Sequence, residues 1–422
     1  MGVCVAIAPA WALRLSTGGH NYGDVLAGEA PGWQGVTTEN IGQYLREALL
    51  GRIYGLAPAD RCHACRKAVI GSSRTARFPT TGHARMVKVL VTGGAGFIGS
   101  NFVHFVLKAH NNWHVTTLDK LTYAGRRENL AHLDTHPRHR FVKGDITDNS
   151  VAGPLVREAN IVVHFAAETH VDRSLHNAGE FIQTDVYGTF VLLNAAREAP
   201  NLRRFVQIST DEVYGNITTV GSLETDELRP SNPYSASKAG ADRLAYSYWA
   251  TYKIPVIISR SSNNYGCYQH PEKIIPLFVT NALENLPLPL YGDGQNTRDW
   301  LHVVDHCRAV DLLIDKGTSG EVYNIGGSNE ITNIALTRRI LSLLGRPNSL
   351  ITLVPDRPGH DRRYCLDTSK LRRLGWTPHV DFESGLEATV AWYRENETWW
   401  RPIKDDNTAF KTFYNQHYTN RT

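Results

Sequence analysis

From Val87 onward the chain alternates short apolar runs with longer segments that have the periodicity of helices. Helical periodicity is clear at Gly96–His110 and at Ala236–Tyr252. Alternation of this kind is typical of a parallel sheet that is covered on both faces. The pattern therefore predicts an α/β fold with a doubly wound parallel sheet. The predicted strands are Val87–Thr92, His114–Leu118, Arg140–Lys143, Ile161–Phe165, Phe205–Ser209 and Pro255–Ser259.

After about residue 265 this alternation ends. Turn-forming residues gather at Leu286–Pro289 and at Tyr291–Gly294. We expect this part of the chain to form a second, smaller C-terminal lobe over the carboxyl edge of the sheet. The sequence contains no apolar stretch long enough to span a bilayer.

The first 85 residues differ in charge from the rest. They contain nine Lys and Arg against five Asp and Glu, and so carry the whole formal net charge of +4. The remaining residues are balanced, with 36 of each sign. This balance excludes neither enzyme nor binding protein, but it gives no reason to expect nucleic acid or a membrane as a partner.

Met86 directly precedes the first predicted strand, and we interpret residues 1–85 as an N-terminal extension that is disordered or follows from a misassigned start. Ala6 stands where a myristoylation signal needs Ser or Thr. Cys62 and Cys65 form a single C-x-x-C without a second pair, so zinc is a weak alternative and we expect no metal. The six cysteines show no disulfide framework, which predicts a cytoplasmic protein.

A glycine pattern follows the first predicted strand. Gly93, Gly96 and Gly99 are spaced three residues apart and open the first predicted helix. Glycine lets a pyrophosphate approach the backbone N–H groups at a helix N-terminus. Asp119 stands 20 residues past Gly99, at the end of a strand, where it can accept hydrogen bonds from a ribose. The pattern predicts a Rossmann-type dinucleotide site. NAD is favoured over NADP because a carboxylate repels a ribose phosphate, although Lys120 weakens this preference.

Candidate acid–base groups follow at the end of another strand. Thr210, Asp211 and Glu212 come directly after Phe205–Ser209, at the edge where parallel strands deliver active-site side chains. Tyr234 and Lys238 form a Tyr-x-x-x-Lys pair. We expect the Lys238 charge to favour the phenolate of Tyr234, which would make Tyr234 a base for hydride transfer. The adjacent carboxyl groups indicate removal of water in addition. Taken alone, an Asp-Glu after a strand is also typical of a helix cap or a turn.

Together these motifs resemble the extended short-chain dehydrogenase/reductases and, among them, the dTDP-glucose 4,6-dehydratases. The resemblance runs from about Met86 to about residue 415 and rests on VLVTGGAGFIGSNF, LDKLTYAG, KGDITD, HFAAETHVDRS, ISTDEVYG, PYSASKAGAD, SNNYG, YGDGQNTRDWLHVVDH and DRPGHDRRY. It implies an NAD-binding domain at 86–265, with a return segment at about 303–327, and a sugar-nucleotide-binding lobe mainly at 266–415. Two positions depart from the pattern: Cys267 stands where Pro is usual, and Asp185 where many relatives have Asn.

The resemblance also implies which residues bind the ligands. For NAD these are Gly93, Gly96, Phe97, Ile98, Gly99, Asp119, Lys120, Leu121, Thr122, Asp145, Ile146, Ala166, Ala167, Thr184, Tyr234, Lys238 and Asn264. For the nucleotide-sugar they are His170, Thr210, Asn263, Lys273, Ile274, Pro289, Leu290, Tyr291, Arg298, Asn324, Asp356, Arg357, Pro358, Gly359 and His360. From the residues alone, Asp145 could equally be a turn residue, His170 a buried structural histidine, Tyr291 part of the lobe core, and Arg298 an ion-pair partner of Asp299.

The implied reaction converts dTDP-glucose to dTDP-4-keto-6-deoxy-glucose and water through tightly bound NAD, in deoxysugar (rhamnose-type) biosynthesis. Tyr234 would take the proton of the carbon-4 hydroxyl, and Thr210 would hydrogen-bond the same oxygen. Glu212 would remove the proton from carbon 5, and Asp211 would protonate the departing carbon-6 hydroxyl. Close placement of the two acids raises the pKa of one of them, which would help Asp211 hold its proton.

Three other functions stay open. A UDP-glucose 4,6-dehydratase needs the same residues. An NAD-dependent nucleotide-sugar 4-epimerase needs Tyr234 and Lys238 but not the Asp211–Glu212 pair. A non-enzymatic NAD-binding protein would be expected to have lost part of this set, and all of it is present.

The resemblance implies a homodimer as well. The predicted helices Phe181–Arg197 and Ala236–Tyr252 carry four candidate contacts across a two-fold axis, all of which could instead be core. These are Phe190, Leu192, Tyr246 and Trp249.

Overall fold

The computed structural model describes residues 85–218, 220–405, 408–415 and 418. The hypotheses on the N-terminal extension, among them the zinc alternative at Cys62 and Cys65, lie outside these residues. Within the described part, no helix is long and apolar enough to cross a membrane. The same residues contain no group of three or more His, Cys, Asp or Glu that could hold a metal ion.

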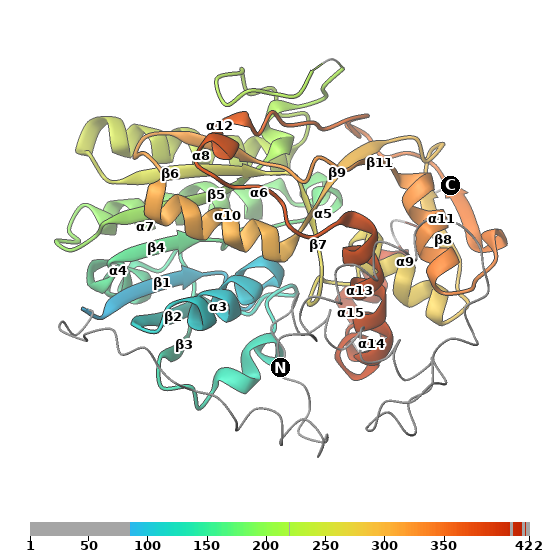
Figure 1. Ribbon diagram of the computed structural model, residues 1–422, viewed down its shortest axis with the longest axis horizontal. Coiled ribbons are helices and arrows are strands. Elements are labelled where there is room, and N and C mark those ends of the chain that lie inside the picture. Colours follow the sequence, from blue (N-terminus) through green and yellow to red (C-terminus); the bar gives the residue numbers. More distant parts are fainter. Residues whose placement is uncertain (1–84, 219, 406–407, 416–417, 419–422) are drawn as a thin grey trace, which may run out of the picture. The chain divides into compact units, whose positions relative to one another are not determined.

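A sheet of seven parallel strands forms the centre of the fold, in the order β10-β6-β5-β4-β1-β2-β3 (Figure 1). The strand order reverses between β1 and β4, and in open α/β sheets a ligand binds beside such a reversal, at the carboxyl ends of the strands. The predicted doubly wound sheet is confirmed. Its strands are β1 (Val87–Thr92), β2 (Trp113–Asp119), β3 (His139–Lys143), β4 (Ile161–His164), β5 (Arg204–Thr210), β6 (Val256–Ser261) and β10 (Val322–Ile325).

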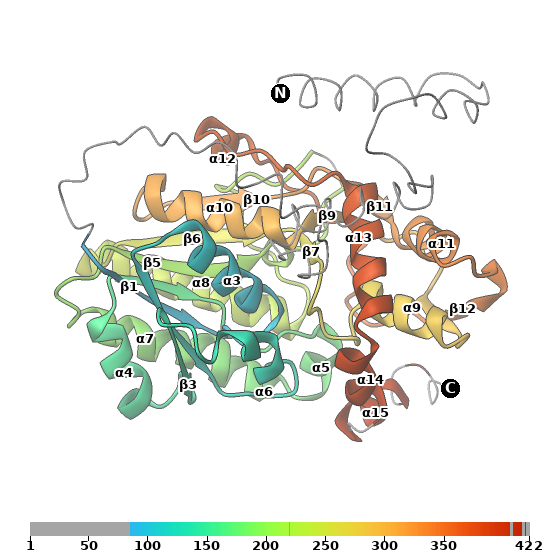
Figure 2. The same ribbon diagram turned by 60° about the horizontal axis from the view of Figure 1, so that its bottom comes forward.

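Helices cover both faces of this sheet, which explains why most of its central strands carry apolar side chains on both sides. In β1, Val89 and Val91 face one hydrophobic cluster and Leu90 faces the other, as the alternation of side chains in a strand requires. Figure 2 shows α3 and α10 on one side and α4 and α7 on the other. The covering helices are α3 (Phe97–Ala109) and α10 (Val303–Lys316) on the first face, and α4 (Asn149–Glu158), α7 (Thr189–Ala196) and α8 (Pro233–Tyr252) on the second.

The chain leaves the central sheet after β6 and builds a second, smaller group of elements. It has two small sheets, β11-β9-β7 and β12-β8, and helices α9, α11 and α13 pack against one another. The chain returns to the central sheet through α10 and β10. The strands of this part are β7 (Asn263–Tyr265), β8 (Leu288–Tyr291), β9 (Thr297–His302), β11 (Glu330–Thr332) and β12 (Ile351–Val354). The helices are α9 (Ile274–Leu283), α11 (Asn333–Leu343), α12 (Ser369–Arg373), α13 (Phe382–Glu395), α14 (Glu397–Asp405) and α15 (Thr408–Tyr414).

The predicted helix Phe181–Arg197 is not regular. It is divided into α6 (Ala178–Phe181), the π-helical turn η3 (Ile182–Gly188) and α7. The side chain of Asp185, inside η3, accepts hydrogen bonds from Glu168 and Ser237, which hold this turn from outside the helix. Hydrogen bonds between distant segments therefore override the local helical pattern. The remaining short helices are η2 (Arg127–Leu133), α5 (Val171–His176), η4 (Asp211–Tyr214) and η5 (Asn348–Leu350).

The four candidate dimer contacts divide into two pairs. Leu192 is fully buried in the core between the sheet and α4, α7 and α8, so for this residue the core alternative holds and the dimer contact does not. Trp249 packs against the same core, over Gly320. Phe190 and Tyr246 are exposed.

Candidate functional site

A cavity opens at the carboxyl ends of the central strands, beside the reversal of strand order. All five candidate catalytic residues line it. Every candidate NAD residue except Leu121 lines it too, which brings together side chains from six strand ends. Of the candidate nucleotide-sugar residues, only Thr210, Asn263 and Lys273 do so.

In the glycine turn after β1, a larger residue at Gly93 or Gly99 would not fit without rearrangement. Gly93 has a φ of +69°, and a Cβ there would lie 2.5 Å from the Ala166 backbone nitrogen. A Cβ on Gly99 would lie 2.2 Å from the Gly93 carbonyl oxygen. These contacts hold the first turn of α3 close to β4, so that its free N–H groups face the cavity.

Asp119 ends β2 beside this turn. Its carboxylate accepts the Ala95 N–H at 2.9 Å and the Leu121 N–H at 2.8 Å, and burial raises its pKa. Leu121, at a φ of +58°, does not line the cavity, and its backbone N–H instead orients the Asp119 carboxylate. Nearby, the Lys120 ammonium lies 2.7 Å from Asp145 Oδ2, an ion pair that leaves the half-exposed Asp145 at the cavity wall.

Asp211 and Glu212 begin the short turn η4, directly after β5. The Thr210 hydroxyl lies 3.1 Å from Asp211 Oδ1 and accepts the Glu212 N–H, which caps the turn. Asp211 is buried, and its Oδ2 has no hydrogen-bond partner among the described residues. A buried polar atom without a hydrogen bond destabilises the fold, so this oxygen is suited to form a hydrogen bond with a ligand.

The proton affinities of these two carboxyl groups differ. Burial, and then the charge of Glu212, raise the pKa of Asp211 well above its usual range. Burial also raises the pKa of Glu212, but the positive charges of Arg357, Arg298 and Lys273 oppose the rise. Asp211 thus holds a proton more tightly than Glu212, in the direction expected from the sequence.

Tyr234 and Lys238 lie one turn apart at the start of α8, where Asn232 and Ser235 form a capping box. The Lys238 ammonium donates to the Ile208 carbonyl at 2.7 Å. Burial, and then the charges of Glu212 and Asp185, raise the pKa of Tyr234 well above its usual range. Desolvation and the nearby carboxylates therefore set the net direction of this pKa, and the expected effect of Lys238, a charge that favours the phenolate, stays a prediction.

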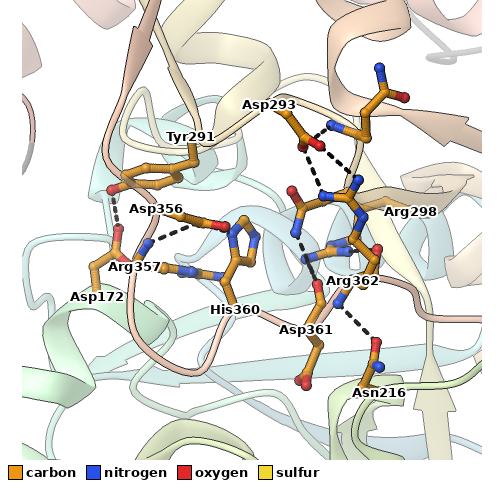
Figure 3. A network of polar contacts seen from close by, with 12 residues as sticks. Asp172, Asn216, Tyr291, Asp293, Arg298, Asp356, Arg357, His360, Asp361 and Arg362 are labelled. Carbon is orange, nitrogen blue, oxygen red and sulfur yellow. Dashed lines mark hydrogen bonds and ion pairs between the residues drawn. The ribbon is translucent and has the colours of Figure 1, made fainter.

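Figure 3 shows a network of polar side chains in which Asp172 of α5 meets residues of the smaller part of the chain. Two of its members, Arg298 and Arg357, place positive charge near Glu212. Asp172 accepts the Tyr291 hydroxyl at 2.9 Å and pairs with Arg357 at 2.8 Å. Tyr291 is thus bound to a buried carboxylate from the sheet side of the site. His360 Nδ1 lies 2.6 Å from Asp356 Oδ1.

Arg298 makes no ion pair with Asp299 among the interactions of the described residues. Its guanidinium donates to backbone carbonyls, including that of Asp361 at 2.9 Å, and lies over the ring of Tyr364. Tyr364 in turn donates to Asp361 Oδ2 at 2.8 Å and lies 3.4 Å from Glu212 Oε2. Tyr364 and Asp361 were missed as site residues, although both stand in the string DRPGHDRRY.

Asn324 is fully buried in β10, away from the cavity lining. It accepts the Tyr214 hydroxyl at 2.8 Å, and its amide donates to the Ser222 and Asp367 carbonyls. The structure thus gives Asn324 a role inside the sheet, where the resemblance implied a nucleotide-sugar contact. The other candidate nucleotide-sugar residues that do not line the cavity are His170, Ile274, Pro289, Leu290, Tyr291, Arg298, Asp356, Arg357, Pro358, Gly359 and His360.

The fold and this cavity define a dinucleotide-binding α/β enzyme whose Tyr/Lys pair is joined by a buried pair of carboxyl groups. Residues 90–389 match the profile of the family described as GDP-mannose 4,6 dehydratase. The chain belongs to this family.

Individual relatives narrow the comparison. The chain is 49% identical over 328 residues to a dTDP-glucose 4,6-dehydratase of Streptomyces niveus. The alignment covers 76% of this chain and 97% of that protein. The fold is similar to the crystal structure of DesIV, a dTDP-glucose 4,6-dehydratase from Streptomyces venezuelae with NAD bound. The two chains are 51% identical and superpose with a TM-score of 0.73, and the match covers 75% of this chain and 100% of the other. A UDP-glucose 4-epimerase from Thermus thermophilus, in complex with NAD, is 30% identical with a TM-score of 0.68, covering 73% and 99%.

Proposed function

We propose that the protein is a hydro-lyase that converts dTDP-glucose to dTDP-4-keto-6-deoxy-glucose and water, an NAD-dependent nucleotide-sugar 4,6-dehydratase. The main support for this proposal is the buried Asp211–Glu212 pair, which lines the same dinucleotide cavity as Tyr234 and Lys238. The two carboxyl groups differ in proton affinity. An enzyme that only moved hydride would have no use for this second acid and base.

The residues at the cavity fit NAD. The close-packed glycine turn presents N–H groups for the pyrophosphate, and Asp119 is positioned for a ribose. When bound, NAD supplies the acceptor and later the donor of hydride. The residues that would hold it are Gly93, Gly96, Phe97, Ile98, Gly99, Asp119, Lys120, Thr122, Asp145, Ile146, Ala166, Ala167, Thr184, Tyr234, Lys238 and Asn264, with Leu121 acting through Asp119.

The protons move between side chains of this chain and the sugar. Tyr234 accepts the proton of the carbon-4 hydroxyl as the phenolate, a form that the Lys238 charge favours and that burial and the nearby carboxylates oppose, with Thr210 hydrogen-bonded to the same oxygen. The ketone formed at carbon 4 acidifies the proton on carbon 5, and Glu212 removes it. Asp211 protonates the carbon-6 hydroxyl, which leaves as water. Glu212 returns its proton to carbon 5, while carbon 6 would receive the hydride that left carbon 4. Tyr234 then holds the proton of the carbon-4 hydroxyl and both carboxyl groups are ionised, so one proton has to pass from Tyr234 to Asp211 before the next turnover.

Arg298 and Arg357 are suited to a diphosphate because each guanidinium is a planar donor of several hydrogen bonds. Arg357 already pairs with the buried Asp172, so it offers its remaining donors. Together with Lys273, these groups would attract the diphosphate of the nucleotide-sugar to the side of the cavity where Glu212 lies.

The function is tested by mass spectrometry of the purified full chain with dTDP-glucose and, separately, with UDP-glucose, without added NAD. We expect loss of one water from dTDP-glucose. Loss of water mainly from UDP-glucose would keep the mechanism and change the substrate. An unchanged mass with both, repeated with NAD supplied, would contradict dehydration. That result would leave 4-epimerisation, another sugar substrate, or no enzymatic activity as alternatives, and the solved structure from Thermus thermophilus represents the first of these.

We further propose a homodimer. The segment η3–α7 and helix α8 carry exposed apolar side chains: Ile182 (52% exposed), Tyr187 (45%), Phe190 (39%) and Tyr246 (41%). Apolar side chains gathered on adjacent helices are typical of an association surface.

Tyr187→Glu should convert the dimer to a monomer, because the interface would have to desolvate an unpaired carboxylate. The measurement is the molar mass by sedimentation velocity. Leu353→Glu, at a residue that is 63% exposed on β12, is the matched control and should leave the mass unchanged. A dimer that persists in Tyr187→Glu would contradict this surface.

The functional parts that we propose keep the boundaries expected from the sequence: 86–265 with about 303–327 for NAD, and mainly 266–415 for the nucleotide-sugar. The proposed location is the cytoplasm, since the described cysteines, Cys267, Cys307 and Cys365, are free thiols.

A further inference from the structure

A buried carboxyl group lies behind the Tyr234–Lys238 pair. Asp185 is 1% exposed and stands in the π-helical turn η3, packed against α8. Turns of this kind inside helices are frequent at functional sites. The preceding residue, Thr184, lines the cavity, so Asp185 belongs to the layer directly behind the cavity wall.

Both oxygens of Asp185 are hydrogen-bonded. Oδ1 accepts the Glu168 N–H at 2.8 Å, and Oδ2 lies 2.6 Å from the Ser237 hydroxyl. The Ser237 oxygen also lies 2.8 Å from the Tyr234 carbonyl oxygen. A hydroxyl has one proton to donate. An ionised Asp185 takes that proton. A protonated Asp185 can instead donate to Ser237 and release the Ser237 proton to the Tyr234 carbonyl.

Charged and titratable groups face Asp185 from each element around it. Lys238 and Tyr234 face it from α8. Burial raises the pKa of Tyr234 and the Asp185 charge adds to this rise, whereas burial lowers the pKa of Lys238 and the charges of Asp185 and Asp242 oppose this fall. Glu168 faces it from the segment after β4, where burial, Asp185 and Glu180 raise the Glu168 pKa to about 7, against Lys120 and Arg173. His164, whose pKa burial lowers to about 3, connects to the Asp185 carbonyl through Thr189 and stays neutral.

We propose that Asp185 is a positioning residue whose charge sets the pH range of the reaction by acting on Tyr234 and Lys238. This inference rests on the proposed function, because it concerns the proton that Tyr234 accepts. Asp185 touches neither substrate nor cofactor in this scheme. It acts through the hydroxyl of Ser237 and through its charge.

The sign follows from the charges. Burial raises the pKa of Asp185 to about 6, so the group is negative at neutral pH. Its charge opposes the phenolate of Tyr234 and favours the ammonium of Lys238. Removing the charge therefore lowers both pKa values. Both limbs of the bell-shaped pH profile of kcat/KM should move to lower pH.

The test is the pH profile of kcat/KM for dTDP-glucose in the full-chain holoenzyme, with wild type measured first. Asp185→Asn keeps the shape of the side chain and removes its charge. We expect both limbs to move to lower pH by about one unit. Glu180→Gln is the matched control: Glu180 is exposed and faces Glu168, and its removal should leave the limbs in place.

The outcomes separate the two proposals. No dehydration by wild type at any pH would overturn the proposed function itself. An active Asp185→Asn whose profile changes only in height would overturn the inference, since a purely structural role does not move the limbs. If Asp185→Asn does not fold, Ser237→Ala replaces it. Loss of the hydroxyl raises the Asp185 pKa, so the limbs should move the same way by a smaller amount, and unmoved limbs would again overturn the inference.

Discussion

Glu212→Gln and Asp211→Asn should each slow the loss of water by about 10²- to 10⁴-fold while leaving the fold and the NAD content of the purified protein unchanged. Neither amide can exchange the proton that the proposed step requires. Each is close in shape to the carboxyl group that it replaces, so the hydrogen bonds of Thr210 around η4 can persist.

The measurement is the rate of water loss by mass spectrometry, with the bound NAD quantified after denaturation of the protein. Glu227→Gln is the control, because Glu227 is exposed and pairs only with the exposed Arg229 among the described ion pairs. Full turnover in both site variants would show that the acid–base assignment is wrong. Loss of NAD together with activity would indicate instead that the pair supports the cofactor site.

Arg260→Met should lower the free energy of unfolding by about 3–5 kcal/mol, the cost of leaving a buried charge without its partner. Arg260 on β6 is 1% exposed and donates to Asp242 Oδ2 at 2.9 Å, and Asp242 on α8 is fully buried. The same guanidinium donates to the Tyr214 hydroxyl at 2.8 Å, which connects it to Asn324. The substitution therefore disturbs α8, η4 and β10 together.

The measurement is the free energy of unfolding from urea titration. Adding Asp242→Leu to Arg260→Met should recover much of the loss, because it removes the orphaned carboxylate. Arg229→Met, at an exposed ion pair, should leave the urea midpoint unchanged. A loss below about 1 kcal/mol in Arg260→Met would mean that the buried pair contributes no more than an exposed one.

The central sheet could be predicted from the sequence because both of its faces are covered. Most central strands are then apolar on both sides, as in Val89–Val91 of β1, and the helices between strands are recognisable by their period. The glycine turn and Asp119 were predictable for a similar reason, since their roles depend on spacing along one β–α–β segment. Thr210, Asp211, Glu212, Tyr234 and Lys238 likewise stand next to a strand end or a helix start.

The rest depends on contacts between segments far apart in the chain. Tyr364 comes within hydrogen-bonding reach of Glu212 across 152 positions, and no local pattern indicates this. The raised pKa of Tyr234 reflects its burial first and then carboxylates from η4 and η3, and the spacing of Tyr234 and Lys238 along the chain does not indicate these contributions. Asn324 is a polar residue within a short apolar run, but its side chain is bound by a buried tyrosine and two carbonyls.

The return of the chain through α10 and β10 has a consequence for the order of events during synthesis. Strand β10 pairs with β6, and α10 covers one face of the sheet, against which its own Val310 and Leu313 are buried. Until Val322–Ile325 has left the ribosome, β6 presents an unpaired edge and that face lies open to water, a state that invites association with other chains. By then β7, β8 and β9 have already emerged. The sheet that carries the dinucleotide cavity can therefore complete its strand pairing only after much of the smaller part has been synthesised. We expect the two parts to complete folding together.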